Sequence, residues 1–466
     1  MLFSSIPFIY YFLPAFLIIY YLVPKSLKNT VMLLASLVFY AWGEPKYVVL
    51  MVITIAIGYV SGLLIEKFRG KTLGKVFLVA SVGIDLALLG YFKYADFFIS
   101  TVNSVVGSDI PLLRVALPIG ISFYTFQILS YSVDVYRGDT RAQRNPIDLA
   151  AYITSFPQLI AGPIVRYIDI EGQLKERTVT FDMAAEGIRR FVIGLAKKIL
   201  IANTLGELCE IFRAEDEKTV LFYWLYAIAF SLHIYFDFSG YSDMAIGLGK
   251  LMGFDFMENF NYPYISASVT EFWRRWHMSL GSWFRDYLYI PLGGNRVSKA
   301  RWFLNILVVW MATGFWHGAA WNFILWGLWF AFFLVMEKLW LGKLLKKTKI
   351  LSHVYVLVCV AISFVLFNAV DLKEAVSYVG GMFGIGGMGF VGGNFFYYLK
   401  SYALVLVAAC FFATPVSKNL MKKFRATDIG AKVLTWAEPV VLCLLVVVMT
   451  AFLVDGSFNP FLYFRF

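Results

Sequence analysis

The chain has 466 residues, of which 60% are hydrophobic and 15% charged, and its net charge is +11. Soluble proteins average about 45–50% apolar and about 25% charged residues, so this composition excludes a soluble enzyme, a disordered chain and a secreted disulfide scaffold. The mean hydropathy of +0.71 instead indicates an integral membrane protein. Lys and Arg gather in short loops between apolar segments, where they are typical of the cytoplasmic side and of contacts with membrane lipids. The positive charge therefore requires no nucleic-acid partner.

The first 136 residues form regular apolar segments separated by loops of alternating charge. Spans are expected near 6–23, 30–43, 47–65, 76–93 and 115–135. The loops after the first, third and fifth spans are basic, and the loops between them are not. Because basic loops stay in the cytoplasm, this alternation predicts an N-terminus outside.

The C-terminal spans, within 350–466, give a second indication of orientation. Basic clusters at 343–349 and 418–425 enclose two predicted spans, near 354–370 and 399–416. An even number of spans returns both clusters to the same side, as the charge rule requires. A last span near 432–454 then places the C-terminus outside, where the terminal FLYFRF at 461–466 is a candidate docking element.

The middle of the chain, 140–340, is irregular. The apolar segment 147–163 is broken by Pro157 and by Gly162-Pro163. Such a segment favours a re-entrant hairpin, which is tolerated in a membrane only where it is buried in protein or lines a cavity. Residues 271–301 interleave Arg with Trp and Tyr, a pattern typical of the membrane interface.

Only four histidines occur, so each can be assessed individually. His233 precedes Asp237 by one helical turn, which predicts a polar pair that is either structural or part of an intramembrane pathway. His277 lies beside two arginines. Two interpretations of this position are open: a histidine that contacts lipid headgroups, or a residue of a functional site. Neither His277 nor His317 has a nearby cysteine or a carboxylate cluster, so no metal site is expected.

His317 lies in an apolar stretch, 302–336, that would be about 50 Å long as one helix and so exceeds a hydrocarbon core of about 30 Å. The stretch must therefore break or turn, and Gly314 and Gly318 flank the histidine at the natural place. On a helix, Trp310 and Trp321 would share its face. The pattern predicts a neutral imidazole walled by indoles and able to accept a proton. The lining expected around it consists of Trp310, Trp316, Trp321 and Asn322.

Several long blocks of the chain resemble the membrane-bound O-acyltransferase (MBOAT) family, and within it the membrane subunits of bacterial alginate O-acetyltransferases and related polysaccharide acetylases. The blocks are FYAWGEP at 39–45, LPIGISFYTFQILSYSVDVYRG at 117–138, FPQLIAGPIVRY at 156–167, FDFSGYSDMAIGLGKLMGF at 236–254, FWRRWHMSLGSWFRDYLYIPLGGNR at 272–296 and TGFWHGAAWNFILWG at 313–327. Their length and unusual composition make a chance similarity improbable.

The resemblance implies an all-α polytopic membrane protein with a ring of about ten to twelve membrane helices, some short, tilted or re-entrant, around a central chamber. The whole chain, 1–466, would be one membrane domain in which the regular N-terminal spans of 1–136 precede a catalytic core at 140–340. The family's near-invariant histidine falls on His317. Its second polar position falls on His277, where many eukaryotic relatives carry Asn or Asp.

The resemblance also implies a mechanism. The donor would be acetyl-CoA from the cytoplasm, with no permanently bound cofactor, and Arg274, Arg275 and Arg285 would clamp its phosphates. His317 would act as general base on an acceptor hydroxyl, while His277 would orient the reactants or stabilise the oxyanion. An acetyl-histidine intermediate is the competing mechanism.

The external loops are too short to bind a polysaccharide, so the resemblance implies a separate SGNH-hydrolase-like partner outside a bacterial cytoplasmic membrane. The final acceptor would be a cell-surface polysaccharide. Two alternatives stay open. One is a D-alanyl transfer subunit for teichoic acid that uses a carrier-protein thioester, and the other is a non-enzymatic transporter or flippase.

Overall fold

The computed structural model describes residues 1–456, which form helices and loops without any strand. The chain packs into two compact units. Unit 1 comprises Met1–Phe191 and Met244–Met257, and unit 2 comprises Val192–Asp243 and Glu258–Phe466. The all-helical membrane fold is confirmed. The boundaries between the two units fall inside the predicted catalytic core, 140–340. The sequence was divided by the pattern of apolar and charged segments, whereas the units reflect how the helices pack. The single membrane domain and the ring around a chamber stay predictions.

Unit 1 is built mainly from the N-terminal helices. In chain order they are η1 (Pro7–Phe12), α1 (Leu13–Leu22), η2 (Lys25–Leu27), α2 (Lys28–Ala41), η3 (Pro45–Tyr47), α3 (Val48–Lys67), α4 (Thr72–Leu89), η4 (Gly90–Tyr94), α5 (Ala95–Val106), α6 (Ile121–Arg137), α7 (Pro146–Thr154), α8 (Phe156–Leu159) and α9 (Tyr167–Lys175). Two long helices, α10 (Phe181–Ala196) and α12 (Val220–Met252), contribute residues to both units.

Unit 2 contains the remaining helices. They are η5 (Lys197–Asn203), α11 (Thr204–Ala214), η6 (Pro263–Ile265), α13 (Val269–Arg275), α14 (Met278–Phe284), η7 (Arg285–Tyr289), α15 (Lys299–His317), α16 (Trp321–Met336), η8 (Glu337–Leu341), α17 (Gly342–Leu345), α18 (Lys349–Asn368), α19 (Leu372–Met382), α20 (Gly393–Ser401), α21 (Ala403–Phe412), α22 (Val416–Arg425) and α23 (Asp428–Val454).

Six of the described helices are long and apolar enough to cross a membrane, and a seventh span results if α20 and α21 are counted together. The prediction of about ten to twelve inserted helices also included shorter segments. A helix such as α2, with 14 residues, is only about 21 Å long and falls short of a hydrocarbon core of about 30 Å. The predicted number of helices is therefore larger than the number of full-length spans because it includes helices too short to cross the membrane.

The predicted span near 399–416 is a broken one. The axes of α20 and α21 differ by 60°. Two side chains of α20 bind the carboxylate of Glu215: the Tyr398 hydroxyl lies 2.7 Å from it and the Asn394 amide 3.2 Å. These polar contacts fix the direction of α20, which differs from that of the apolar α21.

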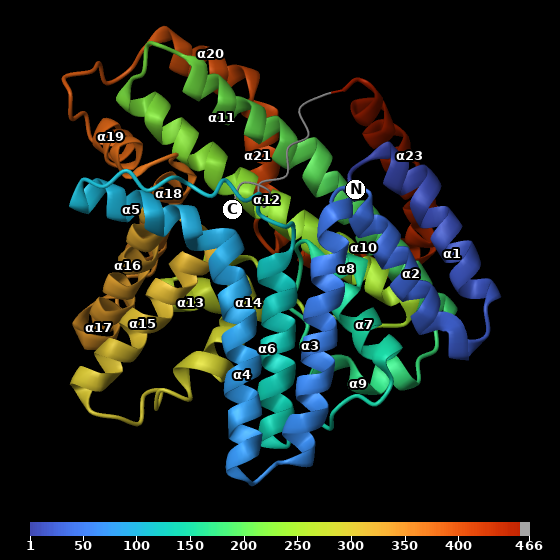
Figure 1. Cartoon of the computed structure of the whole chain (residues 1–466). Coiled ribbons are helices and arrows are strands. Elements are labelled where there is room, and N and C mark those ends of the chain that lie inside the picture. Colours follow the sequence, from blue (N-terminus) through green and yellow to red (C-terminus); the bar gives the residue numbers. More distant parts are fainter. Residues whose placement is uncertain (457–466) are drawn as a thin grey trace. The chain divides into compact units, whose positions relative to one another are not determined.

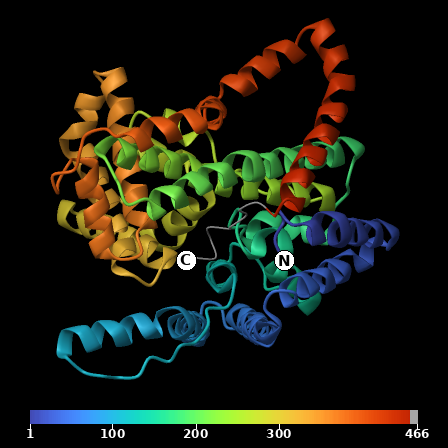
Figure 2. The ribbon, with the colours of Figure 1, turned by 90° about the horizontal axis from the view of Figure 1, so that it is seen from above.

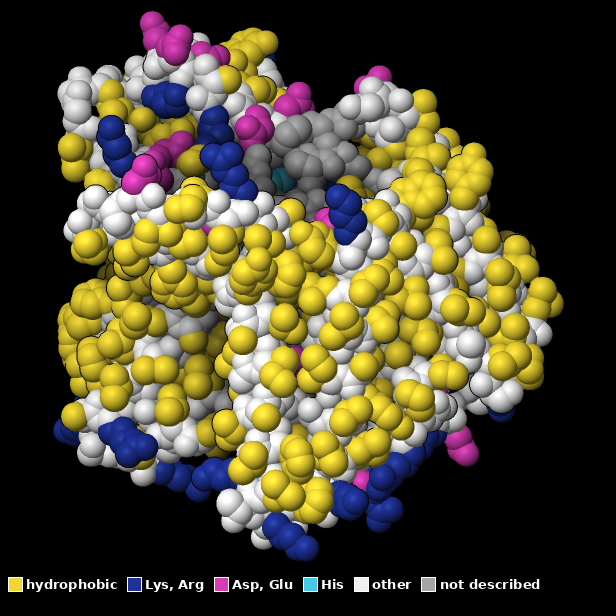
Figure 3. All heavy atoms as spheres, in the orientation of Figure 1, with side chains coloured by type: hydrophobic (Ala, Val, Ile, Leu, Met, Phe, Trp, Pro, Cys, Tyr) yellow, Lys and Arg dark blue, Asp and Glu magenta, His cyan; other side chains and the backbone are white. Residues whose placement is uncertain are grey.

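In unit 1, α3, α4 and α6 lie side by side (Figure 1) and are seen end-on in Figure 2. A Cβ atom on Gly62 of α3 would lie 2.6 Å from the Tyr131 hydroxyl of α6, so the helices approach closely there. Hydrophobic side chains cover the visible face of these helices, and Lys and Arg gather at the end formed by the α3–α4 loop (Figure 3). This surface is the one expected for contact with lipid.

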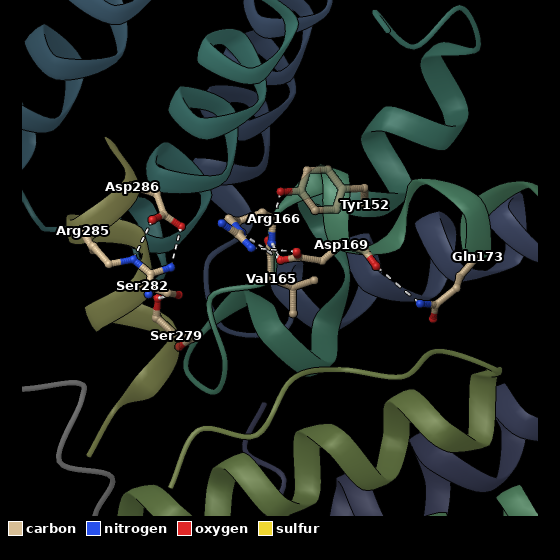
Figure 4. A network of polar contacts seen from close by, with 9 residues as sticks. All are labelled: Tyr152, Val165, Arg166, Asp169, Gln173, Ser279, Ser282, Arg285 and Asp286. Atoms are coloured by element: carbon tan, nitrogen blue, oxygen red, sulfur yellow. Dashed lines mark hydrogen bonds and ion pairs between the residues drawn. The ribbon is translucent and has the colours of Figure 1, made fainter. Parts of the chain in front are cut away.

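The predicted break in segment 147–163 is confirmed. Helix α7 ends at Thr154 and the four-residue α8 follows, with Pro157 in its first turn. The segment is buried, and side chains satisfy two backbone carbonyls at the break: Gln158 donates to the carbonyl of Tyr152 (2.9 Å), and the Tyr152 hydroxyl donates to the carbonyl of Val165 (3.0 Å; Figure 4). These bonds satisfy part of the irregular backbone inside the protein, as a membrane requires.

In unit 2, α12 carries a buried ion pair. The ammonium of Lys198 lies 2.6 Å from the carboxylate of Asp237, and the two side chains are 2% and 1% exposed. His233, one turn before Asp237, has its Nδ1 atom 2.6 Å from the carbonyl oxygen of Ala202. Helical spacing points to His233 as the partner of Asp237, whereas the structure pairs Asp237 with Lys198 and places His233 at the Ala202 carbonyl, both on η5. The His233–Asp237 pair stays a prediction.

We expect Lys198→Met to lower the free energy of unfolding by about 3–5 kcal/mol, because it leaves a buried carboxylate without its cation. The double variant Lys198→Met/Asp237→Leu should recover most of this loss, since it removes both charges. Denaturation in detergent measures both effects. An equal loss in the single and double variants would show that the ion pair is not what stabilises this position.

Candidate active site

His317 is placed by a tight hairpin of two helices in unit 2. Helix α15 ends at His317, and α16 begins at Trp321 beside it (Figure 1). A Cβ atom on Gly314 would lie 2.3 Å from the carbonyl oxygen of Phe323, and one on Gly327 would lie 2.3 Å from that of Trp310. Only glycine permits such close approach. The predicted break in the long apolar stretch is therefore confirmed, and His317 stands at the turn.

Aromatic rings surround the buried imidazole of His317. Its ring centroid lies 4.9 Å from that of Trp316, 5.1 Å from Trp326 and 5.3 Å from Phe367. Trp310 packs against Trp326, with ring centroids 6.3 Å apart. An indole wall was predicted, but Trp326 and Phe367 were not among its predicted members.

Trp321 and Asn322 begin α16 and have different surroundings. Because the chain turns between α15 and α16, the helical spacing that aligned Trp321 with His317 does not apply, and the Trp321 side chain is 52% exposed. Asn322 is buried, and its amide donates to the carbonyl oxygens of Leu366 (3.4 Å) and Ala369 (2.9 Å). Asn322 therefore anchors the end of α18, and a role of either residue in lining a chamber stays a prediction.

His277 occupies a strained position between α13 and α14. Its backbone φ is +45°, in the left-handed region that few non-glycine residues adopt. A neighbouring segment braces it through backbone bonds: the N–H of Met278 donates to the carbonyl of Asn259 (3.0 Å), and that of Asn261 donates to the carbonyl of Arg275 (2.9 Å). Strain of this kind persists where the surrounding structure holds it, and it concentrates at functional sites.

The side chain of His277 is 2% exposed and lies against polar and aromatic neighbours. Its Nδ1 atom lies 3.1 Å from Asn259 Oδ1, and the ring of Phe238 meets it edge-on at 4.6 Å. Burial, with the nearby His317 as a smaller cause, holds the pKa of His277 well below its usual range. His277 is therefore neutral at physiological pH.

The structure brings the two predicted histidines together around one indole. The ring of Trp316 lies 4.9 Å from His317 and 6.2 Å from His277, centroid to centroid. Both imidazoles are buried, and an unprotonated imidazole nitrogen can accept a proton from a hydroxyl group where bulk water is excluded. This pairing is what acyl transfer to an alcohol needs.

The three predicted donor-binding arginines differ in availability. Arg275 binds Glu271 (2.9 Å) and the carbonyl of Asn261 (3.1 Å). Arg285 makes two hydrogen bonds to Asp286, of 2.7 and 3.1 Å, as Figure 4 shows. Arg274 is exposed and forms no ion pair with any residue in 1–456. The arginine best placed to meet a new anion is therefore Arg274.

The part of the chain that the structure describes contains no group of three or more His, Cys, Asp or Glu side chains that could hold a metal ion.

The profile of the membrane-bound O-acyltransferase family matches residues 120–379, a range that contains both histidines. The chain belongs to this family. It is 45% identical to the probable alginate O-acetylase AlgI of Azotobacter vinelandii, over 83% of this chain and 79% of that protein. The corresponding protein of Pseudomonas putida is 40% identical over 100% of both chains. The peptidoglycan O-acetyltransferase of Helicobacter pylori is 31% identical over 100% of this chain and 98% of its own.

These relatives agree on one chemistry. The chain is a multi-pass membrane acyltransferase, an O-acetyltransferase of the alginate O-acetylase type. The transporter or flippase considered from the sequence is thereby set aside.

We expect Gly314→Ala to lower the free energy of unfolding by about 1–3 kcal/mol, because the new methyl group would overlap the Phe323 carbonyl. It should also reduce acetyl transfer, since a displacement of about 1 Å at a catalytic group can cost about a hundredfold in rate. Gly83→Ala in α4 is the matched control, because a Cβ atom there meets nothing within 4 Å. Thermal unfolding and activity in lipid measure both variants, and equal behaviour of the two would contradict the tight hairpin.

Proposed function

We propose that this acyltransferase takes acetyl from cytoplasmic acetyl-CoA and passes it across the membrane for O-acetylation of a cell-surface polysaccharide. The observation that carries the proposal is the pair of buried histidines, His277 and His317, beside Trp316. The names of the relatives support an acetylated polymer outside the cell, alginate for some and peptidoglycan for another.

The reaction needs one new bond, one broken bond and one transferred proton. The oxygen of the acceptor hydroxyl bonds to the carbonyl carbon of the thioester, and the carbon–sulfur bond breaks. The hydroxyl proton passes to the histidine pair, in which the family resemblance favours His317 as base, and then to the thiolate to give free CoA. In the alternative route a histidine nitrogen carries the acetyl group between the two substrates. Both routes require exclusion of water, which the ring wall of His317 favours.

Acetyl-CoA supplies phosphates, and the arginine-rich segment beside His277 supplies cations. Arg274 is the leading candidate, because its guanidinium is exposed and forms no ion pair within residues 1–456. Arg275 and Arg285 would first have to leave the carboxylates of Glu271 and Asp286. The donor site therefore centres on Arg274 in this proposal.

The polymer itself calls for a partner. The loops of the described residues are short, and none forms a separate domain that could hold a polysaccharide. We place an SGNH-hydrolase-like protein outside the membrane as the next acetyl carrier. The FLYFRF segment predicted to dock such a partner lies outside the described residues, and the external placement of both termini also stays a prediction.

Purified protein in lipid with labelled acetyl-CoA should release free CoA when an acceptor is present, and His317→Ala should abolish that release. A loss of about a hundredfold or more is expected when one member of the catalytic histidine pair is removed. Unchanged turnover in His317→Ala would overturn the assignment.

His233→Ala is the matched control, because His233 is equally buried but bonds to the Ala202 carbonyl. It should retain transfer. A wild-type protein that ignores acetyl-CoA yet accepts a carrier-protein thioester would instead establish the D-alanyl alternative.

Arg274→Ala should raise the KM for acetyl-CoA about tenfold, with kcat little changed, because it removes a charge-assisted bond made before and during the reaction. Arg296→Ala removes the same charge from another exposed arginine of the region and should leave KM near that of the wild type. Steady-state kinetics at fixed ionic strength separate the two. A similar KM change in both variants would indicate a general effect of charge and not a phosphate site.

A further inference from the structure

The side-chain amide of Asn259 is held in one orientation. The backbone N–H of Ser279 lies 3.2 Å from Oδ1, and Nδ2 donates to the hydroxyl of Ser242 at 2.9 Å. A backbone N–H can only donate, so the atom that faces it must be the amide oxygen. Asn259 is 1% exposed, which leaves no room for exchange of these contacts with water.

This fixed oxygen determines where His277 carries its proton. His277 Nδ1 lies 3.1 Å from Asn259 Oδ1. If Nδ1 carried no proton, two lone pairs would face each other across this distance, so Nδ1–H donates to the amide oxygen. The hydroxyl of Ser279 does not compete, because it lies 2.9 Å from Oδ1 but 3.4 Å from Nδ1 and donates to the oxygen.

The opposite ring nitrogen is then an acceptor. A neutral imidazole has a single N–H, so with Nδ1 protonated, Nε2 presents a lone pair. Nε2 is buried and has no hydrogen-bond partner among residues 1–456. A buried acceptor without a partner is costly, and a hydroxyl group of a bound substrate would complete the bond.

We propose that Asn259 is a positioning residue that fixes His277 in the Nδ1–H tautomer, and that His277 accepts the hydrogen bond of the attacking hydroxyl through Nε2. The identity of that hydroxyl rests on the acetyl transfer proposed above. Of the two roles predicted for His277, orienting the reactants agrees with this tautomer, whereas donation to an oxyanion does not.

The proton balance follows from this geometry. The attacking hydroxyl has one hydrogen, and it points at Nε2. As the oxygen–carbon bond forms, the proton moves to His277, whose imidazolium is stabilised by the existing bond to Asn259. The carbon–sulfur bond breaks and the proton returns to the thiolate. Within the histidine pair of the proposed reaction, His277 is thus the member that first takes the proton, and His317 lies beside the same indole as the second member.

The tautomer can be read directly. In protein labelled with ¹⁵N-histidine, protonated and unprotonated ring nitrogens give separate NMR signals, and the chain has only four histidines. A His277→Gln spectrum assigns the signals of His277. We expect Nδ1 of His277 to carry the proton in the wild type, and Asn259→Leu to populate the Nε2–H form. A proton on Nε2 in the wild type would overturn the proposal, whatever the protein acetylates.

Kinetics give a second test. Asn259→Leu should lower kcat by about tenfold or more, as loss of a partner that orients a catalytic histidine does, while the KM for acetyl-CoA stays within about twofold. Asn305→Leu, which removes another buried amide of unit 2, should leave the tautomer of His277 unchanged. If Asn259→Leu matched the wild type in kcat, the proposed positioning role would be lost.

Asn259→Asp keeps the acceptor oxygen and adds a negative charge, which raises the pKa of His277. A base must be unprotonated, so the acid limb of the kcat/KM profile should move to higher pH. His317 is the titratable side chain that acts on His277 in the described structure, and its own variants give the reference profile. An acid limb that stays in place or moves to lower pH would show that His277 is not the base. A wild type inactive with acetyl-CoA would refute the proposed function but leave the NMR result standing.

Discussion

The site depends on one constraint: a polar group buried in a membrane protein must find its partner within the chain. Asn259 meets the constraint with four groups: the hydroxyl of Ser242, the backbone N–H of Ser279, the hydroxyl of Ser279 and the ring of His277. Lys198 and Asp237 meet it as an ion pair. Where every bond of a side chain is accounted for, its orientation is fixed. The atom left over, Nε2 of His277, is then the informative one.

Two features visible in the sequence led to the correct architecture. The apolar runs identified helices at both ends, of which Pro45–Lys67, Thr72–Val106, Lys349–Asn368 and Asp428–Val454 are long enough to cross a membrane. The excessive length of the run around His317 required the turn that the structure contains. Contacts between distant residues could not be inferred in the same way. Asn259 lies 18 residues before His277, and no periodicity relates the two. Trp321 illustrates the opposite error, since its spacing from His317 had meaning only on an unbroken helix.

The sequence also does not show whether an arginine is already bound to a carboxylate or is available to bind a ligand. Arg274, Arg275 and Arg285 look alike in the sequence, yet two of them already hold carboxylates. The names of the relatives differ in their polymer, because proteins named for alginate and for peptidoglycan align with most of the same chain.

The left-handed backbone at His277 has a consequence for which amino acids can occupy that position. Apart from glycine, Asn and Asp are the residues that enter this region of φ most readily. Those are the types that the family resemblance assigns to the same place in many eukaryotic members. The backbone conformation at position 277 therefore restricts which amino acids can replace His277, independently of the chemistry of the side chain. His277→Ala would remove the imidazole and also raise the backbone strain at this position. His277→Asn would remove the imidazole with less change in strain, because Asn adopts this backbone conformation more readily.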